Sequence, residues 1–105
     1  MKISILNLAP LRQGENFKDA IDAMIRLAKK ADELGYERYW IAEHHNMKSV
    51  ASSATQLLIQ RTLDNTKNIR VGSGGVMLPN HSPYIVAEQY GTLETLYPGR
   101  VDLGL

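Results

Sequence analysis

The sequence predicts an α/β fold built around a parallel sheet. Short β-rich runs alternate with amphipathic helical segments, and each helical segment is followed by a breaker. The cycle restarts roughly every 30–35 residues, which is the size of a βαβ unit. This alternation indicates four parallel strands joined by three helices in right-handed crossovers. The spacing alone leaves open whether the sheet curls into a barrel or forms an open, doubly wound sheet.

The first predicted unit is a strand at residues 3–8 followed by a helix that Asn16 can cap. Asp19 falls in the first turn, where the helix dipole favours a negative charge. Apolar residues recur at steps of three and four, which predicts one buried helix face. These residues are Phe17, Ala20, Ile21, Met24, Ile25, Ala28, Ala31 and Leu34. Gly35 follows where a left-handed C-terminal cap is expected.

The second predicted strand, residues 39–42, is apolar at consecutive positions, as is typical of a strand covered on both faces. Its aromatic residues, Tyr39 and Trp40, are expected in the core. The next helix is expected to begin at Ser52 or Ser53 and to end near residue 65. Along one side this helix is expected to carry Ala54, Leu57, Leu58 and Arg61.

The third predicted strand, residues 69–76, is interrupted by glycines at 72, 74 and 75. Ser82 and Pro83 predict a helix start, with serine as the cap and proline at the first helical position. That helix continues through Val86, Tyr90, Leu93 and Leu96 until a Pro-Gly pair at 98–99 stops it. Residues 101–105 predict a fourth strand. We expect one domain over residues 1–105, with no linker and no second domain.

The composition is that of an ordinary folded protein, with 44% hydrophobic and 22% charged residues. The net charge is +1 and no basic stripe is present, so neither nucleic acid nor an anionic membrane is an expected partner. The absence of cysteine excludes disulfides, thiolate metal sites and a cysteine nucleophile. The apolar run at the N-terminus is too short for a signal peptide, and we expect a cytoplasmic protein.

Ligands of parallel α/β proteins bind at the carboxyl ends of the strands. This rule selects residues 7–10, 43–46 and 74–81. In the second segment, Glu43, His44 and His45 combine a carboxylate with two imidazoles, which donate and accept protons near neutral pH. A metal site is disfavoured, because adjacent histidines diverge in an extended chain and no second ligand motif accompanies them. The alternative is a set of hydrogen-bonded loop residues at a strand end.

The glycine-rich segment at residues 72–75 matches neither the dinucleotide nor the Walker phosphate motif. Its glycines permit a sharp bend or the close approach of a flat ligand. A bulged strand end is the alternative interpretation. His81 directly precedes the Ser82–Pro83 helix start and is expected to belong to that cap.

These motifs follow one another in a fixed order along the chain. They are ISILNLAP at 3–10, ADELGY at 31–36, YWIAEHHN at 39–46, VGSGGVMLPNH at 71–81, VAEQ at 86–89 and PGRVDLG at 98–104. The series resembles the N-terminal part of the bacterial luciferase-like monooxygenases, in particular the alkanal-monooxygenase-like subgroup. The AEHHN and GSGGVMLPNH segments are the most specific, and the resemblance runs essentially the full length of the chain.

The resemblance implies a TIM (β/α)₈ barrel that binds reduced FMN at the carboxyl ends of its strands. In this family reduced flavin and oxygen oxidise an organic substrate. By position, His44 or His45 would handle protons beside the flavin ring, with Glu43 nearby. These three residues are therefore the expected catalytic residues, and no metal is expected.

The same resemblance implies the cofactor-binding residues. Gly74, Gly75 and Val76 would pass close to the flavin ring system, at a place where the family often has a non-prolyl cis peptide. Ala9 and its neighbours would line the floor of the pocket. These roles come from the resemblance and not from the spacing of the residues.

A TIM barrel takes about 250 residues and eight strands, whereas this chain has 105 residues. We therefore expect a half barrel that lacks the later strands, which hold the flavin phosphate in such families, and that has little activity alone. Its unpaired edges and uncovered inner face predict self-association. The alternatives are a non-catalytic half barrel that oligomerises or pairs with a missing C-terminal half, and a relative that uses a deazaflavin.

Overall fold

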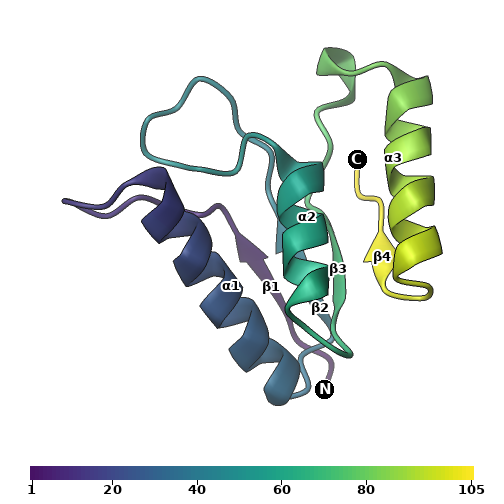
Figure 1. The fold of residues 1–105 in the computed structure, drawn as a ribbon, viewed down its shortest axis with the longest axis horizontal. Coiled ribbons are helices and arrows are strands. Elements are labelled where there is room, and N and C mark those ends of the chain that lie inside the picture. The colour runs from purple at the N-terminus through teal and green to yellow at the C-terminus, as the bar shows by residue number, and fades with distance from the viewer.

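The computed structural model describes residues 1–105 as an alternating series of strands and helices (Figure 1). The strands are β1 (Ser4–Asn7), β2 (Arg38–Ile41), β3 (Arg70–Ser73) and β4 (Val101–Asp102). The helices are α1 (Phe17–Glu33), α2 (Thr55–Asp64) and α3 (Pro83–Leu96), and a short 3₁₀ helix, η1 (Leu78–Asn80), precedes α3. The predicted order of elements is confirmed. β1, β3 and β4 are shorter than predicted, β2 is shifted by one residue, and β3 ends before the glycine pair at 74–75.

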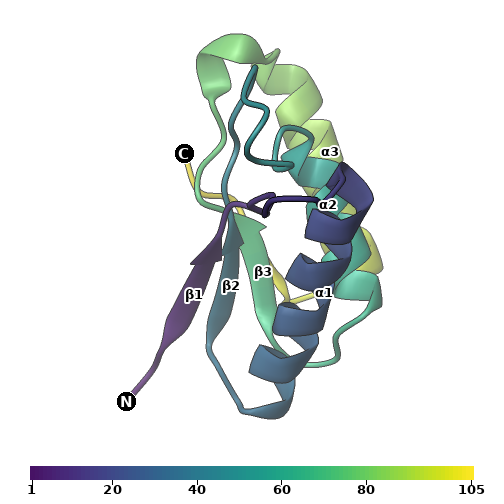
Figure 2. The ribbon, with the colours of Figure 1, turned by 90° about the vertical axis from the view of Figure 1, so that its left-hand side faces the viewer.

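All four strands are parallel, and they lie in the sheet in their sequence order, β1-β2-β3-β4. The three helices all cover the same face of the sheet, and the opposite face has no covering layer (Figure 2). An open, doubly wound sheet carries helices on both faces, whereas the wall of a (β/α)₈ barrel carries them on the outer face alone. The arrangement is therefore that of a barrel wall, as the resemblance implies.

The hydrophobic core lies between the sheet and the helices. Tyr39, Ile41 and Val71 point from the sheet into this layer and are fully buried. The hydroxyl of Tyr39 donates a hydrogen bond to the carbonyl oxygen of Met24 in α1, at 2.9 Å. This bond satisfies a polar group that burial in an apolar layer would otherwise penalise.

Trp40 differs from the sequence-based expectation, because it lies on the uncovered face instead of in the core. Successive strand residues point to opposite faces, so the full burial of Tyr39 against the helices turns Trp40 to the other side. Leu6 is its partner in the ladder and is 56% exposed. The two residues place an apolar patch on the inner surface of the barrel wall.

Helix α1 buries most of the face that its periodicity predicts, including Ala20, Met24 and Ala28. The prediction is wrong at both ends, where Phe17 is 55% exposed and Leu34 is 61% exposed. These residues lie at the first position of the helix and just beyond its last turn, so they have no core partner.

Of the side of α2 named from the sequence, only Leu58 is buried, whereas Ala54, Leu57 and Arg61 are exposed. The buried residues of the helix are Thr55, Leu58, Ile59, Thr62 and Leu63. Two of these are threonines, and burial is tolerated because both hydroxyls have acceptors. Thr55 donates to the carbonyl of Ala42 at 3.0 Å, and Thr62 donates to that of Leu58 at 2.8 Å.

The predicted helix boundaries are confirmed where a side chain supplies a cap. Asn16 accepts a hydrogen bond from the amide of Asp19 and Asp19 accepts one from the amide of Asn16, which completes a capping box. Ser82 caps α3 at the amide of Ile85. Gly35 adopts a positive φ of 78° directly after α1, as a left-handed cap requires. No helix has the combination of length and hydropathy that a membrane span requires.

Candidate functional site

The first three strands end at one edge of the sheet, and the loops that follow them meet there (Figure 1). Strand β2 leads into a loop that contains Glu43, His44 and His45, and β3 leads into the glycine segment and then to His81. Because β2 and β3 are neighbours in the sheet, these two loops come into contact. This edge is where parallel α/β proteins bind their ligands.

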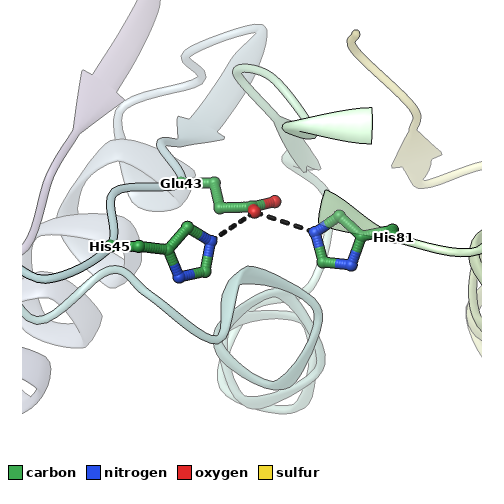
Figure 3. A group of neighbouring side chains, drawn as sticks. All are labelled: Glu43, His45 and His81. Atoms are coloured by element: carbon green, nitrogen blue, oxygen red, sulfur yellow. Dashed lines mark hydrogen bonds and ion pairs between the residues drawn. The ribbon is translucent and has the colours of Figure 1, made fainter. Parts of the chain in front are cut away.

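Glu43 forms the centre of the site, with one imidazole on each side (Figure 3). Its Oε2 atom lies 2.5 Å from Nε2 of His45 and 2.8 Å from Nε2 of His81. Its Oε1 atom accepts a hydrogen bond from the backbone amide of Met77 at 3.2 Å. The Glu43 side chain is 0% exposed, whereas those of His45 and His81 are 40% and 25% exposed. A buried carboxylate is thus held between two solvent-accessible rings.

The electrostatics of Glu43 reflect two opposing effects. Burial raises the pKa of its carboxyl group, but hydrogen bonds from His45, His81 and the amide of Met77 lower it by more. The net result is a pKa below its ordinary value of 4.5. Glu43 is therefore an anion at neutral pH, and it accepts hydrogen bonds from both rings.

His44 points away from this cluster. Its backbone amide donates to the carbonyl oxygen of Ser52 at 3.0 Å. Its ring lines a cavity of about 270 Å³ together with Phe17, Met47 and Val50. Its Nδ1 atom is buried and has no hydrogen-bond partner. The two adjacent histidines thus lie in different environments. His45 is turned to the Glu43 carboxylate, and His44 is turned to a partly apolar cavity.

The glycine segment contains a cis peptide bond between Gly74 and Gly75. A Cβ atom on Gly74 would lie 3.0 Å from Cβ of Trp40 and 3.1 Å from Cδ1 of Leu6. A side chain at this position would therefore crowd the apolar patch on the inner face of the sheet. Gly74 is exposed, whereas the following Val76 is buried in the core.

Ala9, which the resemblance places on the floor of a cofactor pocket, is fully buried in the hydrophobic core. It adopts a positive φ of 49°, and its amide donates to the side-chain oxygen of Asn7 at 2.6 Å. Its carbonyl oxygen accepts from the amide of Ala51 at 2.9 Å. Ala9 thus fixes the path of the loop after β1 and presents no exposed surface.

Among the sequence-predicted site residues, Glu43 and His45 come together, while His44 and Ala9 lie apart from them. The residue that the sequence reasoning missed is His81, which the sequence assigns to a helix cap. Ser82 caps α3 on its own, and the His81 ring turns to Glu43. The position of His81 on the loop after β3 could have indicated this contact, because adjacent parallel strands end side by side and their loops meet.

Comparison with known proteins places the whole chain in one family. The family model described as luciferase-like monooxygenase matches residues 1–105. An uncharacterised protein of Bacillus subtilis is 65% identical over 103 residues, and a luciferase-like monooxygenase of Escherichia coli is 56% identical over 102 residues. The N-acetyl-S-alkylcysteine monooxygenase of B. subtilis is 44% identical over 105 residues. The chain spans 30% of the length of the first two relatives and 31% of the third.

Solved structures give the same result for the fold. Apo-MsnO8 superposes with a TM-score of 0.96 at 48% identity, over 98% of this chain and 31% of its own. The oxygenating constituent of 3,6-diketocamphane monooxygenase from Pseudomonas putida, in complex with FMN, superposes with a TM-score of 0.91 at 28% identity. It matches 99% of this chain and 29% of its own. The chain therefore belongs to the luciferase-like monooxygenase family.

Proposed function

We propose that this chain forms the N-terminal part of an FMN-dependent monooxygenase that uses reduced flavin and oxygen to oxidise a small organic substrate. The observation that carries the proposal is the match of the whole chain to a monooxygenase that was solved with FMN, at a TM-score of 0.91. The convergence of Glu43, His45 and His81 at the ligand-binding edge of the sheet supports it.

The residues at this edge suit a flat, largely apolar ring system. Leu6 is 56% exposed on the inner face of the sheet, beside Trp40 and Gly74. Glycine at position 74 keeps this surface free of a side chain that would crowd both neighbours. The buried and unpartnered Nδ1 atom of His44 is a polar group that a bound ligand or water would satisfy. These features fit a flavin ring better than they fit a highly charged ligand.

Reduced FMN, when bound, would supply the electrons that activate oxygen, and the protein would supply orientation and proton transfer. We assign proton transfer to His44 or His45, since imidazole donates and accepts protons near neutral pH. Glu43 would hold the orientation of the His45 ring through the 2.5 Å contact. His81 would act as a positioning residue, because it fixes the Glu43 carboxylate from the other side at 2.8 Å.

A substitution at His44 tests the catalytic proposal, carried out in the polypeptide encoded by the full reading frame that contains residues 1–105. His44→Ala should lower kcat/KM for oxygen-dependent oxidation by about 100-fold, the usual scale of a lost proton-transfer group. The melting temperature should stay close to that of the wild type. Lys29→Ala, at an exposed position of α1 outside this cavity, is the control and should retain activity. A fall in melting temperature without a fall in kcat/KM would exclude His44 as the proton-transfer residue.

A deazaflavin-dependent oxidoreductase is the second candidate function. An F420-dependent secondary alcohol dehydrogenase superposes with a TM-score of 0.67 at 28% identity. This likeness is weaker than that of the FMN-bound monooxygenase. Anaerobic titration with reduced FMN and, separately, with reduced F420 distinguishes the two. The monooxygenase proposal requires tighter binding of FMN and an oxygen-dependent product, whereas tighter binding of F420 would replace it.

We also propose that residues 1–105 self-associate when they are produced by themselves. The uncovered face of the sheet exposes an apolar patch, in which Leu6 is 56% exposed beside Trp40. The outer strands β1 and β4 each have only one neighbour, so each leaves one edge unpaired. An exposed apolar face with open strand edges favours association between copies of a chain.

A further inference from the structure

We propose that Glu43, His45 and His81 form a binding site for Zn²⁺, which the flavin chemistry proposed above does not require. The ligand atoms that the three residues offer all lie within 4.8 Å of one another. They come from two loops that follow neighbouring strands, so the fold brings them together (Figure 3). Two imidazoles and one carboxylate are a common ligand set for zinc, with the remaining position left to water.

The spacing of the three groups requires only a small adjustment around an ion. Ligand atoms on a tetrahedral zinc ion, at about 2.0–2.2 Å from the metal, lie roughly 3.4 Å from one another. In the structure, Nε2 of His45 and Nε2 of His81 are 2.5 and 2.8 Å from Oε2 of Glu43. Each ring would withdraw by less than about 1 Å to admit the ion. Both rings are partly exposed and lie on loops, so this movement needs no change in the core.

The carboxylate is already oriented for such a role. The amide of Met77 holds Oε1 at 3.2 Å, which leaves Oε2 directed at the two rings. A hydrogen bond to the second oxygen of a ligating carboxylate is a recurrent feature of metal sites, because it fixes the orientation of the ligand. The full burial of the Glu43 side chain also favours a cation, since its only ion-pair partners are the two histidines.

The donor chemistry selects the kind of ion. Imidazole nitrogens favour zinc and the later transition metals, whereas magnesium and calcium favour all-oxygen sites. A zinc ion at this position would be coordinated by Nε2 of His45, the atom through which the ring contacts Glu43. The ion would therefore compete with the positioning role proposed for Glu43, and the site would be inhibitory for the flavin reaction.

Calorimetric titration of the purified protein with ZnCl₂ tests the inference, with histidine-to-glutamine variants as probes. The wild type should bind one ion per chain, and His45→Gln and His81→Gln should each weaken binding by about 100-fold, because each removes a ligand. His44→Gln is the matched control, since His44 is adjacent to His45 and lies outside the cluster; it should bind zinc as the wild type does. Co²⁺ should give the visible absorption of a tetrahedral ion, and this absorption should be lost in His81→Gln.

Other outcomes would overturn the inference. Equal zinc affinity in the wild type, His45→Gln and His81→Gln would identify the binding as adventitious and the cluster as a hydrogen-bonded relay only. An equal loss in His44→Gln would exclude the proposed ligand set. Glu43→Gln is expected to weaken binding as well, and the two histidine variants carry the test if this buried substitution impairs folding, as circular dichroism would reveal. None of these results depends on flavin binding, so a failure here is distinguishable from a failure of the proposed function.

Discussion

His81 Nε2 lies 2.8 Å from Oε2 of Glu43, although 38 positions separate the two residues in the sequence. The contact exists because β2 and β3 are adjacent parallel strands that end at the same edge. The fold thus brings together in one cluster two side chains that are far apart in the sequence. The zinc proposal depends on this contact, and the proton-transfer proposal uses it to hold the Glu43 carboxylate.

The lowered pKa of Glu43 predicts how stability depends on pH. A carboxyl group whose pKa is lower in the folded state stabilises the protein above its ordinary pKa, and this contribution is lost as the pH falls through the lowered value. Glu43→Gln should therefore be less stable than the wild type by about 1–3 kcal/mol well above pH 4.5, the ordinary value. Chemical denaturation at a series of pH values should show the difference shrinking below 4.5. A difference that stays constant across the series would contradict the prediction.

The Arg38–Asp102–Arg70 cluster on the inner face of the sheet should contribute to stability. Asp102 accepts hydrogen bonds from Arg38 at 3.0 Å and from Arg70 at 2.9 and 2.8 Å, and the Arg70 bond is the main cause of its lowered pKa. Asp102→Asn should cost about 1–3 kcal/mol in the free energy of unfolding, because partly buried Arg70 loses its carboxylate partner and Arg38 keeps only Glu37. Urea denaturation measures this loss.

The control for Asp102 is an exposed ion pair. Lys18 and Asp22 are 2.6 Å apart on the outer surface of α1. Exposed pairs contribute little, since water screens them and their side chains lose entropy in pairing. Asp22→Asn should leave the urea midpoint unchanged, and an equal effect at both positions would show that charge alone, and not burial, decides the result.

Substitution by alanine should change the stability of the protein in opposite directions at Gly72 and Gly91. A Cβ atom on Gly72 would lie 2.5 Å from the backbone oxygen of Asp102 and 2.9 Å from Cζ3 of Trp40. Gly72→Ala should therefore destabilise the protein by about 1–3 kcal/mol. Gly91 lies in α3, and a Cβ atom there would have no neighbour within 4 Å, so Gly91→Ala should stabilise by about 0.5–1 kcal/mol. Thermal denaturation of both variants measures the two effects.

Self-association through the inner face predicts different results for two exposed leucines. Leu6 lies on the uncovered face of the sheet, whereas Leu57 is 70% exposed on α2 in the opposite layer. Leu6→Lys should shift the chain towards monomer in light scattering over a range of concentrations, because a charge in an apolar interface opposes association. Leu57→Lys should not change the mass distribution. A wild-type chain that remains a monomer at all concentrations would contradict the proposal.

The sequence predicted the ends of helices correctly where the contacts that stabilise them lie between neighbouring residues. The Asn16 cap, the Ser82 cap and the turn at Gly35 depend on residues within one helical turn, and all three are confirmed. The burial of Thr55 and Thr62 in α2 was not predicted, because threonine is a polar residue in a sequence pattern. Their burial depends on carbonyl acceptors that the sequence pattern does not reveal.

The sequence by itself determined that this protein is a parallel α/β chain of the luciferase-like family, because hydrophobic periodicity, caps and motifs are properties of contiguous residues. It also placed Glu43 and His45 at the carboxyl end of a strand. Only the tertiary structure decided which side chains meet there. It turned His44 away, buried Ala9 and brought His81 to Glu43, since these outcomes depend on which strands are neighbours and on which face each residue occupies.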